Sequence, residues 1–329
     1  MIWATYATLG YRMWTYRKAP KSFTFEEEAW KSLVRCAKDK GLNMIILDLG
    51  EGVQWKSHPE ISIEGAWSHE KVKEEVLRLR EMGIELIPKM NFSACHHLWL
   101  GEYRLMMCTH TYYTVCRDLI EEAYEMFLHP SYIHLGMDEE GSETQFKIYD
   151  HIVNYRKGDI YWHDYKYLTD CVRELGATPW VWGDSAIDDY EGFRKAVTPE
   201  DDLIVNPWWY HAWKEEHFNR LDSREDWFCH LKTHPELTYF EELHARTMEG
   251  YRTLAKDGYK LVPCGSFLGR DEWCFDDLLD EFRGLCKKEN LLGFMTAPWR
   301  HTRVENIPLI EEDFEYLRKA REKYFPENK

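Results

Sequence analysis

One structural unit recurs along the chain, and it restricts the fold more than any other sequence feature. Each copy consists of an amphipathic helix, a glycine, and a short apolar strand that ends in polar or aromatic residues. The clearest copy begins at Ser68, a good helix-capping residue, and passes through Gly83 into the apolar strand 84–88. Helices that alternate with nearly continuous apolar strands indicate a parallel sheet covered by helices.

Eight such strands are expected, and together they define the architecture. They lie at residues 2–8, 42–47, 84–88, 132–135, 179–182, 203–205, 259–263 and 292–297. Eight units in 329 residues predict a single (β/α)8 TIM barrel over residues 1–329, since no Pro-, Gly- or Ser-rich linker marks a second domain. An open, doubly wound sheet is the alternative, but no glycine-rich phosphate-binding loop follows the first strand.

The starts of the first two helices carry local signals. Thr24 and Glu27 have the spacing of a capping box, which predicts a helix that starts at Thr24 and ends at Gly41. Ser68 is expected to cap the second helix with its side chain.

Composition disfavours several classes of protein. A net charge of −16 argues against nucleic acids and anionic membranes as partners. No apolar run approaches the ~18 residues of a membrane helix, and the N-terminus does not resemble a signal peptide. Nine scattered cysteines without a Cys-x-x-Cys pair argue against a disulfide framework or a structural zinc site, and they favour a cytoplasmic location. The sequence does not specify an oligomeric state.

The chain is rich in aromatic residues, with 15 Trp and 20 Tyr. Many of them lie beside Gly, Pro, His or Asp in segments that are expected to be loops. The flat C–H faces of sugars stack on such rings, so an acidic, Trp-rich chain suits a small carbohydrate or glycoconjugate. The alternative is that these rings only fill a large core.

The most informative segment follows the strand at 132–135. This strand ends at Gly136, and the carboxylates Asp138 and Glu139 come directly after it. Neighbouring side chains of a strand point to opposite faces, so both acids can serve one site only where the strand stops and the backbone turns. Two carboxylates at the carboxyl end of a barrel strand, one protonated and one ionised, are the minimal set for glycoside hydrolysis. A solvated acidic loop that continues into Glu140 is the other explanation.

Residues 134–139, His-Leu-Gly-Met-Asp-Glu, resemble the end of the fourth barrel strand in glycoside hydrolase family 20, the β-N-acetylhexosaminidases. Residues 83–88, 180–184 and 293–299 are similar to the third, fifth and eighth strands of that family. The resemblance covers about residues 24–300. It implies a TIM barrel that hydrolyses O-glycosyl bonds from a chain end, without a cofactor or a metal.

The resemblance also implies roles for individual residues. In that family the 2-acetamido group of the substrate attacks its own anomeric carbon, and the configuration is retained. Glu139 would then be the general acid and base, and Asp138 would orient the acetamido group. The expected substrate-binding residues are Arg12, Asp48, His97, His134, Trp182, Asp184, Trp208, Trp209, Tyr210, Trp299 and Arg300.

Several positions differ from the family pattern. Residues 89–96 read Lys-Met-Asn-Phe-Ser-Ala-Cys-His, where the family usually has Glu-x-x-x-Pro-Gly-His. No Tyr follows the seventh strand to hold the acetamido carbonyl, and Tyr210 is the candidate substitute. Arg300 and His301 follow Trp299, where the family commonly has a Glu that binds sugar hydroxyls. These differences concern substrate contacts, so they leave the identity of the sugar open.

Three other functions remain open from the sequence. Glu139 and Asp184 could form a conventional carboxylate pair that acts on a sugar without an acetamido group. A metal-dependent hydrolase is the second, and its candidate ligands are Asp48, His96, His97, His134 and Asp138. No His-x-His or His-x-x-x-His pattern supports it. The third is a catalytically silent barrel that only binds carbohydrate.

Overall fold

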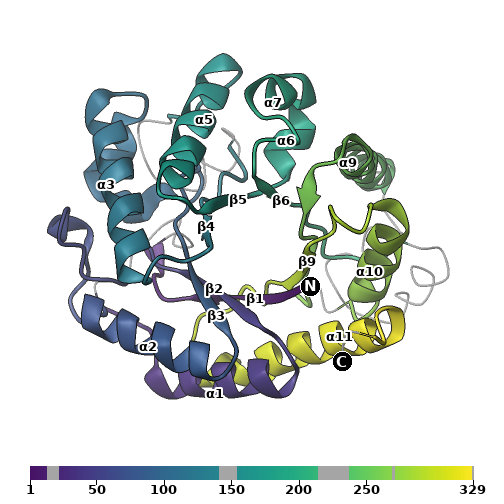
Figure 1. Ribbon diagram of the computed structural model, residues 1–329, viewed down its shortest axis with the longest axis horizontal. Helices are drawn as coiled ribbons and strands as arrows, with labels where there is room; N and C mark the ends of the chain where they lie inside the picture. Colours follow the sequence, from purple (N-terminus) through teal and green to yellow (C-terminus); the bar gives the residue numbers. More distant parts are fainter. Residues whose placement is uncertain (13–21, 141–153, 214–236, 269–270, 328–329) are drawn as a thin grey trace.

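The strands of this chain curl into a ring that helices surround (Figure 1). The computed structural model describes residues 1–12, 22–140, 154–213, 237–268 and 271–327. The strands are β1 (Ile2–Thr8), β2 (Met44–Asp48), β3 (Glu85–Lys89), β4 (Tyr132–His134), β5 (Thr178–Trp182), β6 (Ile204–Asn206), β7 (Lys260–Leu261), β8 (Cys264–Gly265) and β9 (Gly293–Thr296). They pair in the order β7-β6-β5-β4-β3-β2-β1-β9-β8, and every pair is parallel. The predicted (β/α)8 TIM-barrel fold is confirmed.

The seventh barrel strand is interrupted, which explains why nine strands form an eightfold barrel. β7 pairs with β6, whereas β8 pairs with β9. Pro263 separates the two short strands, and proline has no N–H to donate to a neighbouring strand. Its carbonyl still accepts from Met295, so the two halves together close the ring.

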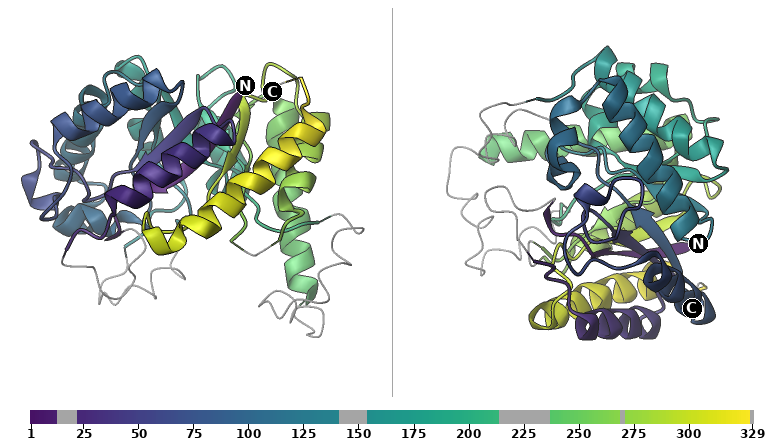
Figure 2. Two further views of the ribbon diagram at one scale, coloured as in Figure 1. Left: turned by 90° about the horizontal axis from the view of Figure 1, so that it is seen from below. Right: turned by 90° about the vertical axis from the view of Figure 1, so that its left-hand side faces the viewer.

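The helices form the outer layer of the barrel, and Figure 2 shows that α1 and α11, from opposite ends of the sequence, lie side by side. The α-helices are α1 (Glu27–Asp39), α2 (His69–Glu81), α3 (His110–Met126), α5 (Asp159–Glu174), α6 (Asp184–Asp188), α7 (Tyr190–Ala196), α9 (Leu237–Asp257), α10 (Cys274–Leu285) and α11 (Ile307–Tyr324). The short 3-10 helices are η2 (Pro59–Ile61), η3 (His97–Met106) and η6 (Val304–Asn306). Within the described residues, none of these helices is both long and apolar enough to cross a membrane.

Two apolar layers hold the barrel together. The strand residues that alternate inward fill the ring, and this inner cluster includes Ala4, Ile46, Trp180 and Met295. The outward-facing strand residues pack against the helices in a larger cluster. The burial of both faces of every strand explains why the strands read as continuous apolar runs.

The two predicted helix starts have different outcomes. Ser68 caps α2 as predicted, because its side chain accepts a hydrogen bond from the Lys71 N–H at 3.2 Å. The prediction at Thr24 is wrong, since α1 begins at Glu27, and the side chain of Glu26 at the N-cap position makes no capping bond to the helix. The carboxylate of Glu27 accepts instead from Trp67 Nε1 at 2.8 Å, so a tertiary contact replaces the capping box.

Candidate active site

The backbone after β4 makes an unusual turn at the carboxyl end of the barrel. Gly136, Met137 and Glu139 have positive φ values of 72°, 66° and 50°. Glycine adopts this region freely, whereas Met and Glu do so rarely and need contacts that hold them there. A side chain at position 136 would also collide with Asn91, since a Cβ there would lie 2.2 Å from Asn91 Oδ1. The turn expected at Gly136 is therefore present, and its packing requires glycine.

Asp138 and Glu139 are adjacent in sequence but have different surroundings. Asp138 is 7% exposed, and its Oδ1 accepts a 2.8 Å hydrogen bond from Asn91 Nδ2. The Glu139 side chain is 41% exposed, while its backbone N–H donates to Asp184 Oδ2 at 2.7 Å. One carboxylate is thus buried and fixed, and the other can reach a ligand.

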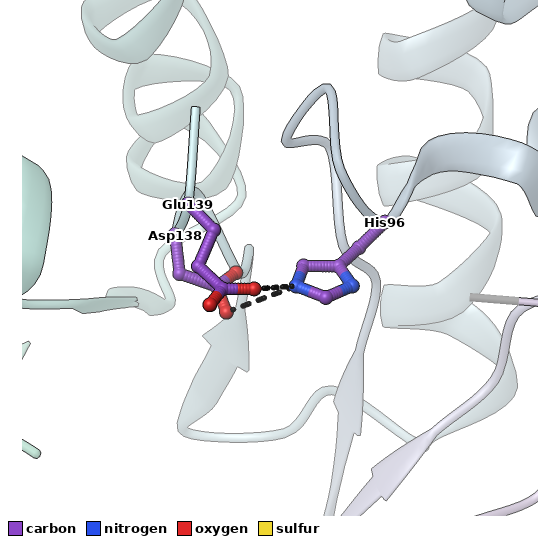
Figure 3. Close-up of side chains that lie close together, drawn as sticks. All are labelled: His96, Asp138 and Glu139. Carbon is purple, nitrogen blue, oxygen red and sulfur yellow. Dashed lines mark hydrogen bonds and ion pairs between the residues drawn. The ribbon is translucent and has the colours of Figure 1, made fainter. Parts of the chain in front are cut away.

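His96 contacts both acids (Figure 3). Its Nε2 lies 3.0 Å from Glu139 Oε2 and 3.5 Å from Asp138 Oδ2. Burial opposes protonation of the ring, but the two carboxylates outweigh it and raise the pKa of His96 to about 9. From the sequence, His96 is a candidate metal ligand only. The position of His96 just beyond the third strand could have indicated that it lies near the two acids, because the carboxyl ends of parallel strands meet at one face of the barrel.

Asp184 organises the backbone beside the two acids. Its Oδ2 accepts from the Glu139 N–H, and its Oδ1 accepts from Trp208 Nε1 at 3.2 Å. Burial and the neighbouring charge of Asp138 raise the pKa of Asp184 to about 8. Since both oxygens already accept from protein donors, Asp184 is suited to orienting Glu139 and Trp208.

Four of the predicted aromatic residues form one cluster at this end of the barrel. The ring of Trp299 lies 5.7 Å from that of Trp182 and 6.2 Å from that of Tyr210. Tyr210 in turn stacks on Trp208 at 5.2 Å, and Tyr6 lies 4.8 Å from Trp299. Trp182 is buried, whereas Trp208, Tyr210 and Trp299 remain partly exposed. The cluster offers flat apolar surfaces beside the acids, as a sugar ring requires.

Trp209 and His134 have other surroundings. Trp209 is largely buried, and its ring packs against His244 at 4.8 Å. His134 is fully buried, and its Nδ1 accepts the Gly136 N–H at 3.0 Å. Burial lowers the pKa of His134 well below its usual value, so the ring is neutral and supports the turn that presents the acids.

Asp48 lies in a buried ion pair. It ends β2 in register with Lys89, which ends β3, and Asp48 Oδ2 binds both Lys89 Nζ and the Tyr6 hydroxyl. The two charged side chains are 1% and 0% exposed. These are the surroundings of a structural pair, and the predicted sugar contact of Asp48 stays a prediction.

The remaining predicted residues are Arg12, His97 and Arg300. The Arg12 N–H donates to Glu51 at 3.0 Å. Arg300 is partly exposed and follows Trp299, whose carbonyl accepts from Arg300 at 3.4 Å. His97 is buried, and burial together with nearby arginine charges lowers its pKa well below the usual value. Their substrate contacts stay predictions.

One group of side chains has the chemistry of a metal site. Ligand atoms of His96, Asp138 and Glu139 all lie within 4.8 Å of one another. Imidazole and carboxylate are suitable ligands for zinc or manganese. Asp48, His97 and His134, which the metal hypothesis also needs, do not belong to this group.

Comparisons with known proteins support the class of fold. No protein-family model and no curated protein sequence matches this chain. Solved structures do match over nearly its whole length. A β-N-acetylhexosaminidase from Bacteroides fragilis has a TM-score of 0.58 and 14% identity over 99% of this chain and 71% of its own. A family 20 β-N-acetylhexosaminidase from Streptomyces coelicolor has a TM-score of 0.60 and 12% identity over 96% and 62%.

Dispersin B is a third neighbour, with a TM-score of 0.56 and 12% identity over 97% of this chain and 98% of its own. These likenesses show a barrel of the kind found in glycoside hydrolase family 20. At identities of 12–14% they establish the fold only. The activity has to be argued from the site.

Proposed function

We propose that this protein is a glycoside hydrolase that releases β-linked 2-acetamido sugars, with Glu139 as general acid and base. The observation that supports this most strongly is the contrast between the two adjacent acids. Glu139 is accessible and contacts a proton-bearing His96, whereas Asp138 is buried and fixed by Asn91. Acid catalysis needs a carboxyl that reaches the leaving oxygen, and substrate orientation needs one that does not move.

The proton path starts at the contact between His96 and Glu139. A proton held between the imidazole and the carboxyl, 3.0 Å apart, can pass through Glu139 to the leaving oxygen as the glycosidic bond breaks. Glu139 is then ionised. It removes a proton from the water that opens the cyclic intermediate, which restores the starting state.

Asp138 acts on the attacking group. Its carboxylate accepts a hydrogen bond from the acetamido N–H, which directs the acetamido oxygen to the anomeric carbon. The same negative charge stabilises the positive charge that develops on the cyclised intermediate. The aromatic cluster of Trp182, Trp208, Tyr210 and Trp299 holds the sugar ring beside the acids. The structural neighbours, which are β-N-acetylhexosaminidases, support this class of substrate.

A panel of chromogenic glycosides, with and without a 2-acetamido group, tests the proposal. We expect turnover of the 2-acetamido sugars, no turnover of their 2-hydroxy analogues, and tight inhibition by an N-acetylglucosamine-thiazoline that mimics the cyclised intermediate. Cleavage of plain hexosides without thiazoline inhibition would favour a conventional carboxylate pair of Glu139 and Asp184. Sugar binding without any turnover would favour a carbohydrate-binding barrel.

A metal-dependent hydrolase is the second candidate, because His96, Asp138 and Glu139 are close enough to share one ion. Exhaustive dialysis against EDTA, followed by metal analysis and activity measurement, separates the two. The glycosidase proposal predicts full activity after metal removal. Loss of turnover that added zinc or manganese restores would support the metal mechanism.

A further inference from the structure

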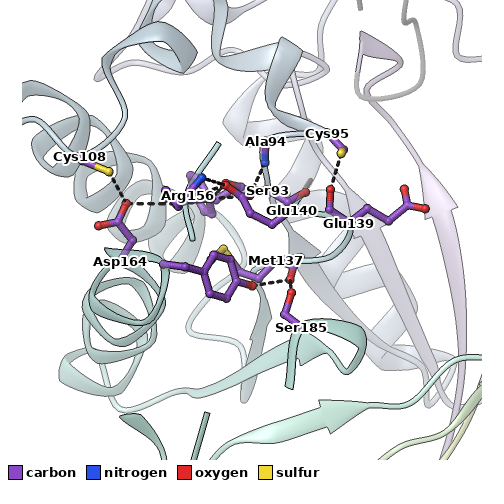
Figure 4. A network of polar contacts seen from close by, with 12 residues as sticks. Ser93, Ala94, Cys95, Cys108, Met137, Glu139, Glu140, Arg156, Asp164 and Ser185 are labelled. Atoms are coloured by element: carbon purple, nitrogen blue, oxygen red, sulfur yellow. Dashed lines mark hydrogen bonds and ion pairs between the residues drawn. The ribbon is translucent and has the colours of Figure 1, made fainter. Parts of the chain in front are cut away.

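A buried network of charged side chains lies beside Glu139 (Figure 4). It consists of Glu140, Arg156 and Asp164, whose side chains are 4%, 1% and 0% exposed. Charged groups are costly to bury unless they are fully paired. The proposed reaction uses none of the three, so their burial so close to Glu139 needs another explanation.

The network ties three segments of the chain together. Glu140 Oε1 accepts from the N–H and the Nε of Arg156 at 2.8 and 3.0 Å, and Oε2 accepts from Arg156 Nη2 at 3.0 Å and from the Ala94 N–H at 2.6 Å. Arg156 also donates to the Phe92 carbonyl at 2.7 Å and to Asp164 Oδ2 at 3.2 Å. The loop after β3, the loop after β4 and helix α5 are therefore joined through one guanidinium.

The two joined loops carry the groups that would exchange the catalytic proton. His96 lies two residues beyond Ala94, and Glu139 directly precedes Glu140. The Cys95 thiol also donates to the carbonyl of Glu139. The network thus sets the spacing between the loop of His96 and the loop of Glu139.

The conformation of Glu139 shows why such support is needed. Its φ of 50° lies in the left-handed region, which glutamate rarely adopts, so neighbouring contacts must hold it. On one side, Asp184 accepts its N–H, and Ser185 donates to the Met137 carbonyl at 3.1 Å. On the other side, the paired side chain of Glu140 anchors the loop.

We propose that Arg156 and Glu140 are positioning residues that fix Glu139 against His96 for proton transfer. The inference rests on the proposed function of Glu139. Both side chains are almost excluded from solvent, so they act through the loops and not by touching the sugar. Without them the turn at Glu139 relaxes, and the contact between Glu139 and His96 lengthens.

The test uses the conservative variants Arg156→Lys and Glu140→Gln in the full-length protein. Lysine keeps the charge of Arg156 but loses the forked geometry that fits a carboxylate, and glutamine keeps the shape of Glu140. Arg117→Lys is the matched control, because Arg117 forms a 2.6 Å ion pair with Glu174 on the surface, at side-chain exposures of 35% and 59%. Asp164→Asn is a milder variant at the longest hydrogen bond that Arg156 makes, 3.2 Å.

The readout is kcat and KM on 2-acetamido glycosides with poor and with activated leaving groups, across pH. We expect kcat on the poor leaving group to fall roughly 10- to 100-fold while KM stays similar, because misplacement of a catalytic group costs this much. The loss should be smaller on the activated substrate, which needs less acid assistance, and the pH profile should shift. The control variant should behave as wild type.

A second background separates positioning from a general structural role. In Glu139→Gln, the substitutions Arg156→Lys and Glu140→Gln should have no further effect on the poor leaving group, since the group that they position is absent. Equal losses in both backgrounds, equal losses on both leaving groups, or folded variants with unchanged kcat would overturn the inference alone. A wild-type protein without glycosidase activity would overturn the proposed function, and this inference with it.

Discussion

The ends of β2 and β4 both carry buried carboxylates, yet their charge is balanced in different ways. At the end of β2, Asp48 is paired with the ammonium of Lys89, and both side chains are sealed from solvent. After β4, Asp138 and Glu139 both contact the imidazole of His96, and the side chain of Glu139 is exposed to solvent. Histidine can exchange protons near neutral pH, so the acids after β4 have a partner that is suited to proton transfer. The residue that pairs with a strand-end acid, more than the acid itself, therefore indicates whether the acid has a structural or a catalytic role.

The largest expected effect comes from breaking the sealed pair. Lys89→Met leaves the charge of Asp48 buried without a counter-charge, which should lower the free energy of unfolding by about 3–5 kcal/mol. The double variant Lys89→Met/Asp48→Leu should regain most of this loss, because no charge is then left buried. Denaturant unfolding measures both, and the exposed Lys73→Met is the control. If Lys89→Met were as stable as wild type, the pair would not be structural.

A substitution at Asp138 should change the catalytic rate more than the stability. Asp138→Asn keeps the shape and leaves Asn91 a partner, but it removes the charge that stabilises the cyclised intermediate. We expect kcat on 2-acetamido glycosides to fall about 10²- to 10³-fold. The unfolding free energy should change far less than in Lys89→Met. A rate near wild type would show that Asp138 does not act on the reacting centre.

The sequence predicts some features of these two strand ends and not others. The helix–strand units predict the barrel and the strand that ends before Asp138, because the periodicity of apolar residues is a local signal. The pairing of Asp48 with Lys89 depends on the register of two strands 41 residues apart, and no pattern in either strand reports it. The contact of His96 with Glu139 could not be predicted for the same reason, since the two residues are 43 positions apart in the sequence.

Every predicted site residue lies within the described residues, but the orientation of loop side chains could not be predicted from the sequence. Trp208, Trp209 and Tyr210 look alike in sequence, yet Trp208 and Tyr210 join the aromatic cluster while Trp209 packs against His244. Which way each ring points is decided by the backbone after β6. That path depends on tertiary contacts such as the Trp208 N–H bond to the Tyr251 hydroxyl.

The smallest predicted effect is on the pH dependence of stability. The pKa of His96 is raised from 6.5 to about 9 in the folded protein, so its protonation stabilises the fold. This contribution is nearly complete below about pH 6.5 and is lost as the pH rises through about 9, with a size on the order of 3 kcal/mol. Burial raises the pKa of Asp184 as well, so the stability contributed by Asp184 also falls as the pH rises. Comparison of wild type with a His96→Asn variant separates the contribution of His96 from that of Asp184.

Unfolding free energies of wild type and His96→Asn at pH 6, 7.5 and 9 measure this effect, with the exposed His110→Asn as the control. The wild type should lose more stability over this interval than His96→Asn. Parallel curves for the two proteins would mean that His96 has no raised pKa, and that the site has no titratable partner for its acids.

The leaving-group dependence of Glu139→Gln tests the central claim most directly. Glutamine keeps the shape of the side chain but cannot donate the proton, so kcat on a 2-acetamido glycoside with a poor leaving group should fall about 10²- to 10⁴-fold. Activated leaving groups should recover much of this loss, and sugar binding should persist. A near-normal rate on the poor leaving group would contradict the account, because Glu139 would then not be the acid.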